Sequence, residues 1–325
     1  MQVRFLLLFL ILLLGNLISL GQSNYALVIH GGAGVLSKEK MEPELQQAYK
    51  NKLDEALTLG ENMLKDGASA TDVVTKVINI MEDSPLFNAG KGAVFTHDGK
   101  NELDASIMEG KTMNAGAVAG VRNIKNPINA ARAVMENSEH VLLSGEGASE
   151  FARQQGLEIV PQSYFYTESR YQSLQRLLKK ERKRETKDNI GTVGCVVLDT
   201  NGNLCAGTST GGMTNKKFGR IGDSPLIGAG TYANNKTCAV SCTGHGEYYI
   251  RLGFARDISA LMEYKNMGIQ EACREEIRKL SEMNGTGGVI GIDTRGNIAM
   301  EFNTSGMFRG YATSAGEKEI AIFEK

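Results

Sequence analysis

The chain has 325 residues with 36 basic and 37 acidic side chains, a formal net charge of −1 and 42% apolar residues. The balanced charge argues against a dedicated nucleic-acid binder, which carries a basic excess, and the apolar content argues against a disordered chain. Glycine is enriched, with 38 residues and no collagen-like period, so the fold needs many tight turns or close backbone approaches.

The amino-terminal segment differs in composition from the rest of the chain. Arg4 precedes an unbroken apolar run over residues 5–14, and a small residue, Gly21, closes the segment. This pattern is typical of a secretory signal peptide covering residues 1–21. A membrane anchor is the alternative, but the run ends at Gly15 and is shorter than the roughly 20 apolar residues that span a bilayer. We therefore expect a mature chain from residue 22 that is secreted or periplasmic and has no membrane association.

The cysteines and histidines give no sign of a disulfide framework or a zinc site. The cysteines are odd in number and lack metal-ligand spacing, and the four histidines are far apart in sequence. In a chain of this length, isolated cysteines are typically small buried apolar residues. The five positions are Cys195, Cys205, Cys238, Cys242 and Cys273.

The first elements of the mature chain are a strand and two helices. Apolar, β-prone residues at 25–30 predict a strand, and the glycine-rich residues 31–34 are expected to turn it. Apolar residues keep near-helical spacing over 45–64 and again over 73–81, where a Ser-x-x-Asp start signal at 69–72 precedes them. Each helix is predicted to pack one face against the rest of the fold.

The remaining elements alternate short strands with helices. Residues 88–120 contain several glycines between short apolar runs typical of buried strands, and a helix is predicted over 127–137. Residues 179–188 mix acidic and basic side chains, which indicates a solvated linker. Segments 196–204 and 290–298 each resemble a β-hairpin with a turn of Asp, Asn and Gly. These patterns favour a layered α+β fold with substantial antiparallel sheet.

The motifs that indicate a chemistry surround Thr192, which lies between the charged linker and a strand. A threonine at the start of a strand is common and carries little information alone. Several glycine- and hydroxyl-rich motifs accompany it, and in this order they resemble the plant-type asparaginase and isoaspartyl peptidase family of N-terminal-nucleophile hydrolases. The resemblance spans the mature chain. The motifs are residues 30–34 (His-Gly-Gly-Ala-Gly), 87–92 (Phe-Asn-Ala-Gly-Lys-Gly), 104–108 (Asp-Ala-Ser-Ile-Met), 207–212 (Gly-Thr-Ser-Thr-Gly-Gly), 219–225 (Gly-Arg-Ile-Gly-Asp-Ser-Pro) and 243–247 (Thr-Gly-His-Gly-Glu).

The resemblance implies a four-layer αββα sandwich made as a precursor that cuts itself between Gly191 and Thr192. The products would be an α chain of residues 22–191, ending in a flexible linker from about residue 179, and a β chain of residues 192–325. Self-cleavage has a chemical reason, because a threonine hydroxyl is a poor nucleophile until a base takes its proton. An α-amine with a pKa near 7.7 to 8.0 supplies that base once the peptide bond is cut. The family also implies a homodimer of cleaved protomers.

The resemblance assigns further roles around the nucleophile and the substrate. Thr210 would orient the Thr192 hydroxyl and amine. Arg220 would hold the α-carboxylate of the substrate, a task suited to a bidentate guanidinium. Asp223 would pair with the substrate α-ammonium. Together these side chains would demand a free aspartyl head group.

The oxyanion and backbone positions come from three other motifs. Thr243 and the backbone N–H of Gly244 would form the oxyanion hole, and Gly246 would line the pocket where backbone approaches the ligand. Asn88 would assist the oxyanion side or the self-cleavage. His30, at the end of a strand, either stabilises the backbone of the active site or is a structural residue with satisfied hydrogen bonds.

A sodium site is the one cofactor that the resemblance implies. The segment 81–91 resembles the sodium loop of the family, in which main-chain carbonyl oxygens hold a monovalent cation, and oxygen ligands suit such a hard cation. No organic cofactor is expected. The carbonyl donors would come from Met81, Glu82, Ser84, Phe87, Ala89 and Lys91.

The implied activity is hydrolysis of isoaspartyl (β-aspartyl) dipeptides and L-asparagine through a β-aspartyl ester on Thr192. A glycosylasparaginase, which cleaves N-acetylglucosaminyl-asparagine by the same mechanism, is the first alternative. The wording of motifs 30–34 and 208–212 and the absence of tryptophan favour the isoaspartyl branch. The second alternative is an uncleaved, non-catalytic relative that binds aspartyl ligands.

Overall fold

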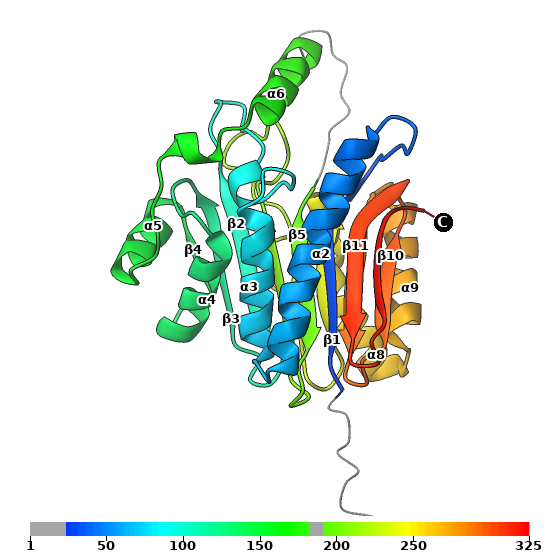
Figure 1. The fold of residues 1–325 in the computed structure, drawn as a ribbon. Helices are drawn as coiled ribbons and strands as arrows, with labels where there is room; N and C mark the ends of the chain where they lie inside the picture. The colour runs from blue at the N-terminus through cyan, green and yellow to red at the C-terminus, as the bar shows by residue number, and fades with distance from the viewer. Residues whose placement is uncertain (1–23, 182–190, 325) are drawn as a thin grey trace, which may run out of the picture.

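The computed structural model describes residues 24–181 and 191–324 of the chain (Figure 1). The predicted signal peptide and most of the predicted charged linker lie outside the described residues. The beginning of that linker, residues 179–181, forms the end of a helix.

An eight-stranded sheet forms the centre of the molecule, in the order β12-β11-β1-β5-β6-β2-β3-β4. Its neighbouring strands pair antiparallel except for β3 and β4, which are parallel. Strands from both sides of residue 191 therefore belong to one sheet. The bounds are β1 Ala26–Gly34, β2 Leu103–Glu109, β3 Ala115–Val121, β4 Leu142–Ser144, β5 Val193–Leu198, β6 Leu204–Thr210, β11 Gly306–Thr313 and β12 Lys318–Phe323.

A second, four-stranded antiparallel sheet packs against one face of the large sheet, in the order β10-β9-β8-β7. Val28 of β1 and Val196 of β5 share a hydrophobic cluster with Val240 and Val289 of the smaller sheet. The neighbouring Ile29 belongs instead to the cluster beneath the helices. Because both faces of β1 and β5 are buried, residues 26–29 of β1 and 195–198 of β5 are continuously apolar. The bounds are β7 Thr231–Ala233, β8 Cys238–Gly244, β9 Gly287–Asp293 and β10 Ile298–Phe302.

Helices cover the outer face of each sheet. Figure 1 shows α2, α3 and α4 side by side over the large sheet, and α8 and α9 contact the smaller sheet. Two short 3₁₀ helices, at Gly90–Gly92 and Gln162–Phe165, lie in the connections. The fold is a mixed α+β structure with two sheets. The helix bounds are α2 Pro43–Lys65, α3 Ala70–Glu82, α4 Pro127–Asn137, α5 Gly145–Gln154, α6 Glu168–Glu181, α7 Gly246–Leu252, α8 Phe254–Lys265 and α9 Ile269–Glu282.

Several local predictions are confirmed. The Ser69 side chain caps α3 by accepting a hydrogen bond of 3.2 Å from the backbone N–H of Asp72, as the start signal indicated. The two predicted hairpins are the pairs β5–β6 and β9–β10. The five cysteines are free and buried. Among residues 24–181 and 191–324, no helix has the length and apolar composition needed to cross a membrane.

The predicted turn at residues 31–34 is wrong, because β1 continues through these glycines with a bulge between His30 and Gly32. Glycine is required at these positions because a side chain would not fit, and not because the chain turns. A Cβ atom on Gly31 would lie 2.4 Å from the Phe87 ring, and one on Gly32 would lie 3.0 Å from the Cα of Gly191. The glycines let β1 pass directly beside residue 191.

Glu82, the last residue of α3, is fully buried between α3, β6 and the start of α4. Its Oε1 accepts hydrogen bonds from the Ser209 hydroxyl at 2.6 Å and from the backbone N–H of Ile128 at 3.1 Å. Burial raises the pKa of this carboxyl to about 8. The neutral acid is therefore the form that the folded protein holds at neutral pH.

Replacing this acid is predicted to change the pH dependence of stability. The pKa of Glu82 is raised on folding, so its contribution is complete below about pH 4.5 and is lost as pH rises through about 8. Glu82→Gln keeps a neutral side chain, and we expect a gain on the order of 3 kcal/mol over the wild type at about pH 9, absent at about pH 4.5. Urea denaturation at both pH values measures it. The exposed Glu44→Gln variant is the control. If the free energy of unfolding changed with pH equally in both variants, the raised pKa of Glu82 would be contradicted.

Candidate functional site

Thr192 lies at the entry to β5 and is 5% exposed. Its hydroxyl lies 2.7 Å from the carbonyl oxygen of Gly191 and 3.1 Å from the hydroxyl of Thr210, which stands at the end of the adjacent β6. Because β5 and β6 are neighbours in the large sheet, their backbone pairing fixes the two hydroxyls next to each other. Two threonine hydroxyl groups and a peptide carbonyl therefore share one buried site.

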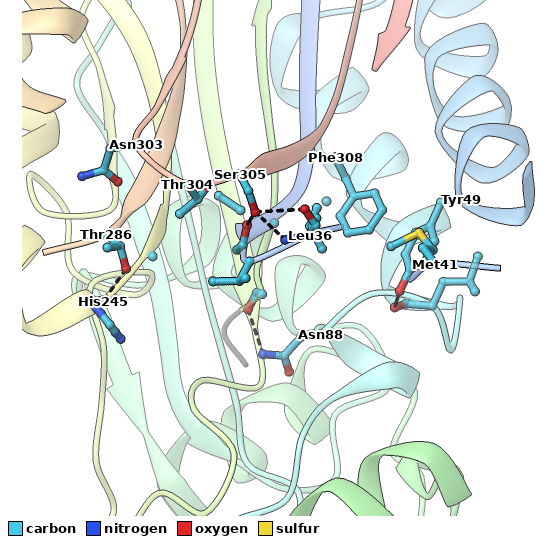
Figure 2. Close-up of a pocket in the computed structure, with 18 of the residues that line it drawn as sticks. Leu36, Met41, Tyr49, Asn88, His245, Thr286, Asn303, Thr304, Ser305 and Phe308 are labelled. Carbon is cyan, nitrogen blue, oxygen red and sulfur yellow. Dashed lines mark hydrogen bonds between the residues drawn. The ribbon is translucent and has the colours of Figure 1, made fainter. Parts of the chain in front are cut away.

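The Gly191 carbonyl oxygen is the acceptor on which the site converges. The side-chain amide of Asn88 donates to it at 2.8 Å (Figure 2), and the Thr210 hydroxyl donates to it at 3.1 Å. The same Asn88 amide donates to the Gly212 carbonyl at 2.7 Å, and its oxygen accepts from the backbone N–H of Val94 at 2.9 Å. Hydrogen bonds thus hold both the nitrogen and the oxygen of the Asn88 side-chain amide. Donors aimed at a carbonyl oxygen stabilise the negative charge that develops there during nucleophilic attack.

Thr243 and Gly244 are the last residues of β8, and they lie next to the glycine segment of β1. The backbone N–H of Ala33 donates to the Thr243 hydroxyl at 3.4 Å, and Gly32 abuts the backbone nitrogen of Thr192. A Cβ on Gly244 would lie 2.4 Å from the Thr286 carbonyl oxygen, so only glycine fits there. The glycine segment of β1 therefore connects Thr192 with the predicted oxyanion positions.

Arg220, Asp223 and Gly246 form one cluster. A Cβ on Gly246 would lie 2.7 Å from the Asp223 Oδ1 and 2.9 Å from the Arg220 Nη2, so backbone approaches both charged groups. Arg220 also makes a two-point ion pair with Glu247, at 2.8 and 2.9 Å. The Oδ2 of Asp223 is buried without a hydrogen-bond partner among the described residues, and burial raises the pKa of this carboxyl to about 7. An unpartnered carboxylate oxygen beside a guanidinium is suited to a ligand that carries both charges.

A second set of buried charges lies behind this cluster. Asp104 is fully buried on β2, directly opposite Thr210, and its Oδ2 has no hydrogen-bond partner in the described parts of the chain. The Lys216 ammonium lies 3.8 Å from a carboxylate oxygen of Asp104 and 3.8 Å from one of Glu102. Burial raises the pKa of Asp104, and Lys216 opposes that shift. Lys216 thus neutralises a negative charge next to the site.

His30 is fully buried and both of its ring nitrogens have partners. Nδ1 lies 3.1 Å from the carbonyl oxygen of Thr192 and Nε2 lies 3.0 Å from the Ser241 hydroxyl. Burial lowers the pKa of His30 to about 3, so the ring is neutral at neutral pH. A carbonyl only accepts, and Nδ1 must therefore carry the proton, while Nε2 accepts from Ser241. His30 holds the backbone of Thr192 without itself titrating near neutral pH.

The Ser241 hydroxyl continues into a buried chain of hydroxyl groups between the two sheets. Ser241 and Thr208 are 2.7 Å apart, Thr208 and Thr231 are 2.6 Å apart, and Ser106 lies 2.8 Å from Thr231. Ser106 also lies 2.6 Å from the carbonyl oxygen of Ser224, the residue after Asp223. Hydrogen bonds thus connect the backbone of Thr192 with the segment that carries the Asp223 carboxylate.

The predicted sodium loop, residues 81–91, spans the end of α3 and the segment after it. A Cβ on Gly90 would lie 2.3 Å from the Glu82 carbonyl oxygen, and one on Gly92 would lie 2.1 Å from that of Phe87 and 2.7 Å from that of Pro85. The carbonyl oxygens of Glu82, Pro85 and Phe87 therefore lie directly against glycine backbone, where a side chain would not fit. No group of three or more His, Cys, Asp or Glu side chains in the described segments is placed to hold a metal ion.

Comparison with known proteins identifies the family. The model of the family described as asparaginase matches residues 23–322. This chain belongs to that asparaginase family. It is 50% identical to the isoaspartyl peptidase of Escherichia coli K12 over 92% of this chain and 96% of the relative. It is 42% identical to the plant-type L-asparaginase of Pyrococcus horikoshii, over 91% of this chain and 99% of the relative. It is 40% identical to the isoaspartyl peptidase/L-asparaginase of Bos taurus, over 87% of this chain and 92% of the relative.

The prediction that this asparaginase-family chain is secreted or periplasmic is wrong. The relatives that match this chain at 50%, 49% and 40% identity, which are the isoaspartyl peptidases of Escherichia coli and Salmonella typhimurium and the bovine isoaspartyl peptidase/L-asparaginase, point against secretion. The composition of residues 1–21 resembled a signal peptide, but a short apolar segment alone does not establish export.

Sequence reasoning missed several residues of the site. Glu247 stood in a quoted motif without a role, yet it forms the ion pair of Arg220. Asp104 and Lys216 are 112 positions apart in sequence, and the pairing of β2 with β6, together with the loop that follows β6, brings them together. The one available signal was that Asp104 is a charged residue inside an apolar strand pattern, which requires a partner.

Removing the Lys216 charge is predicted to destabilise the protein. Lys216→Met leaves Asp104 without its nearest cation, while Glu102 keeps its ion pair with Arg122 at 2.6 Å. We expect a loss of about 3 kcal/mol at about pH 7, because an unpaired buried carboxylate remains, and a smaller loss at about pH 5, where Asp104 is protonated more readily. Urea denaturation at the two pH values measures it. Exposed Lys236→Met is the control, and a Lys216 variant no less stable than this control would contradict the assigned role.

Proposed function

We propose that this chain is an autoproteolytically activated amidohydrolase that cleaves isoaspartyl dipeptides and L-asparagine through a β-aspartyl ester on Thr192. The observation that carries the proposal is the contact of the Thr192 hydroxyl with a peptide carbonyl that already receives hydrogen bonds from Asn88 and Thr210. The relatives at 40–50% identity, which are named isoaspartyl peptidase or L-asparaginase, support the substrate class.

Self-cleavage follows from this arrangement. The Thr192 oxygen attacks the carbonyl carbon of Gly191, and Asn88 stabilises the negative oxygen that forms. The bond from that carbon to the Thr192 nitrogen breaks, the nitrogen takes the hydroxyl proton, and an ester joins Gly191 to the threonine oxygen. Water then hydrolyses the ester. The products are an α chain ending at Gly191 and a β chain, residues 192–325, that begins with a free threonine amine.

The free amine serves as the base in substrate hydrolysis. It takes the proton of the Thr192 hydroxyl while that oxygen attacks the β-carbonyl carbon of the substrate. Thr210 orients the hydroxyl, and Thr243 with the Gly244 N–H stabilises the oxyanion. The amine proton passes to the leaving nitrogen, which departs as ammonia or an amino acid. Water activated by the same amine releases aspartate from the β-aspartyl ester.

The head group of the substrate is held by the charged cluster. Arg220 binds the α-carboxylate, and the unpartnered oxygen of Asp223 binds the α-ammonium, with the Gly246 backbone between them. The arrival of a cation favours the ionised form of Asp223, whose pKa burial raises in the free protein. Glu247 keeps Arg220 oriented when no substrate carboxylate is present.

Three structural features complete the proposal. Helices on the outer faces of two packed sheets support a four-layer αββα sandwich. A homodimer of cleaved protomers follows from the family resemblance. A sodium ion would tie the end of α3 to the loop that carries Asn88, and the carbonyl donors would be those of Met81, Glu82, Ser84, Phe87, Ala89 and Lys91.

The proposed nucleophile has a direct test. Purified protein kept for several hours at neutral pH is expected to show two chains by intact mass, and amino-terminal sequencing of one should begin Thr-Val-Gly. Thr192→Ala should stay a single chain and lose at least about 10³-fold in kcat for L-asparagine, because both nucleophile and base function require this threonine. Thr192→Ser keeps hydroxyl and amine and serves as the matched control. Cleavage or turnover by the alanine variant would refute the mechanism.

The alternatives make different predictions in one assay. A β-aspartyl dipeptide, L-asparagine and N-acetylglucosaminyl-asparagine are offered to the same cleaved preparation. Turnover of only the glycosylated substrate would identify a glycosylasparaginase. One stable uncut chain that binds aspartate without hydrolysis would identify the non-catalytic relative.

A further inference from the structure

A cavity of about 810 Å³ borders the scissile carbonyl (Figure 2). Gly191, Asn88 and Gly244 line it, together with the glycine segment of β1. Arg220 and Asp223, the anchors of the aspartyl head group, are not part of its lining. The cavity therefore meets the reacting centre from a direction that the head-group anchors do not occupy.

Amide hydrolysis divides the substrate at the carbonyl carbon that Thr192 attacks. The acyl half lies toward its anchors, and the leaving half extends from the other side of that carbon. We propose that the cavity is the leaving-group subsite and that it selects β-aspartyl dipeptides whose second residue has an apolar side chain and a free α-carboxylate. This inference rests on the proposed function and specifies its substrate class.

One wall of the cavity is apolar. The rings of Tyr49 and Phe308 stack with centroids 4.1 Å apart, and Met41 and Leu36 extend the same lining. In Figure 2, Tyr49, Met41 and Phe308 lie on one side of Asn88, whereas His245, Thr286 and Asn303 lie on the other. The Tyr49 hydroxyl donates to the Leu86 carbonyl at 2.8 Å, so the polar end of this ring is already satisfied. Its remaining surface is suited to an aliphatic or aromatic side chain.

The same cavity contains a cation without an acidic partner. Arg170 of α6 lines it and donates to the carbonyl oxygens of Gly92 at 2.9 Å and Leu86 at 3.1 Å. No carboxylate in residues 24–181 or 191–324 forms an ion pair with it, and burial lowers the pKa of its guanidinium. A guanidinium withdrawn from water favours an anion, and the only anionic group of a neutral leaving amino acid is its α-carboxylate.

L-Asparagine leaves only ammonia and uses neither feature. A dipeptide such as β-aspartyl-leucine uses both, with the leucine side chain on the Tyr49–Phe308 wall and its carboxylate at Arg170. The subsite therefore raises kcat/KM for the dipeptides over that for L-asparagine. This gain comes from contacts with the leaving residue, because the aspartyl half is the same in all of these substrates.

Substrate changes on the cleaved wild-type enzyme test the proposal without a variant. The value of kcat/KM for β-aspartyl-leucine should exceed that for β-aspartyl-glycine by about tenfold, because glycine leaves the apolar wall uncovered. β-Aspartyl-leucinamide, which lacks the carboxylate, should lose about tenfold relative to β-aspartyl-leucine. Equal values for the three substrates would overturn the subsite. Failure to hydrolyse any of them, L-asparagine included, would refute the proposed function itself.

Variants assign the two halves of the subsite. Arg170→Met should reduce the ratio of kcat/KM between β-aspartyl-leucine and β-aspartyl-leucinamide to about one, mainly through KM. If Arg170 only supports the loop at Leu86 and Gly92, all substrates lose equally and the ratio stays unchanged, which would overturn its role. Met41→Ser should lower the leucine-to-glycine ratio several-fold. Arg176→Met, an exposed arginine on the same helix, is the matched control and should preserve both ratios.

Discussion

The hydrogen bonds to the carbonyl oxygen of Gly191 are the interaction on which the rest of the site depends. Asn88, Thr210 and Thr192 reach this one atom from a loop after α3, from the end of β6 and from the entry to β5. A displacement of any of these elements by about 1 Å would break the convergence. The sheets and helices can be understood as the support for that geometry. β5 and β6 pair directly, and α3 packs on both strands, so the three donors belong to one rigid unit.

Charge burial around the site is costly and is balanced in pairs. Asp223 lies beside Arg220, which also binds Glu247, and Asp104 lies near Lys216. The Oδ2 atoms of Asp104 and Asp223 still have no hydrogen-bond partner among the described residues, as is also true of the Oε2 atoms of Glu82 and Glu276. Unpartnered buried acids destabilise a fold, and they are retained where a ligand supplies the missing charge. The Asp223 oxygen is the group whose missing partner a substrate ammonium would supply. Asp104 is fully buried, so no ligand reaches it, and its charge contributes instead to the electrostatic field around the site.

The glycines of β1 show how one sequence feature serves both fold and chemistry. Their composition alone predicted a turn, because glycine is common in turns. The strand instead continues, and the missing side chains leave room for Phe87, Gly191 and the Thr192 backbone. The same segment lines the cavity that we assign to the leaving group.

The sequence by itself determined the helices predicted over 45–64, 73–81 and 127–137, the hairpins, and the motifs that indicate the family, because periodicity, capping and turn chemistry are local. The tertiary structure decided which distant groups meet. The partnership of Asp104 with Lys216, of Arg220 with Glu247 and of Arg170 with the loop carbonyls depends on strand order and helix packing. A sequence pattern records the spacing along the chain, whereas these contacts depend on distances across sheets, which no local propensity specifies.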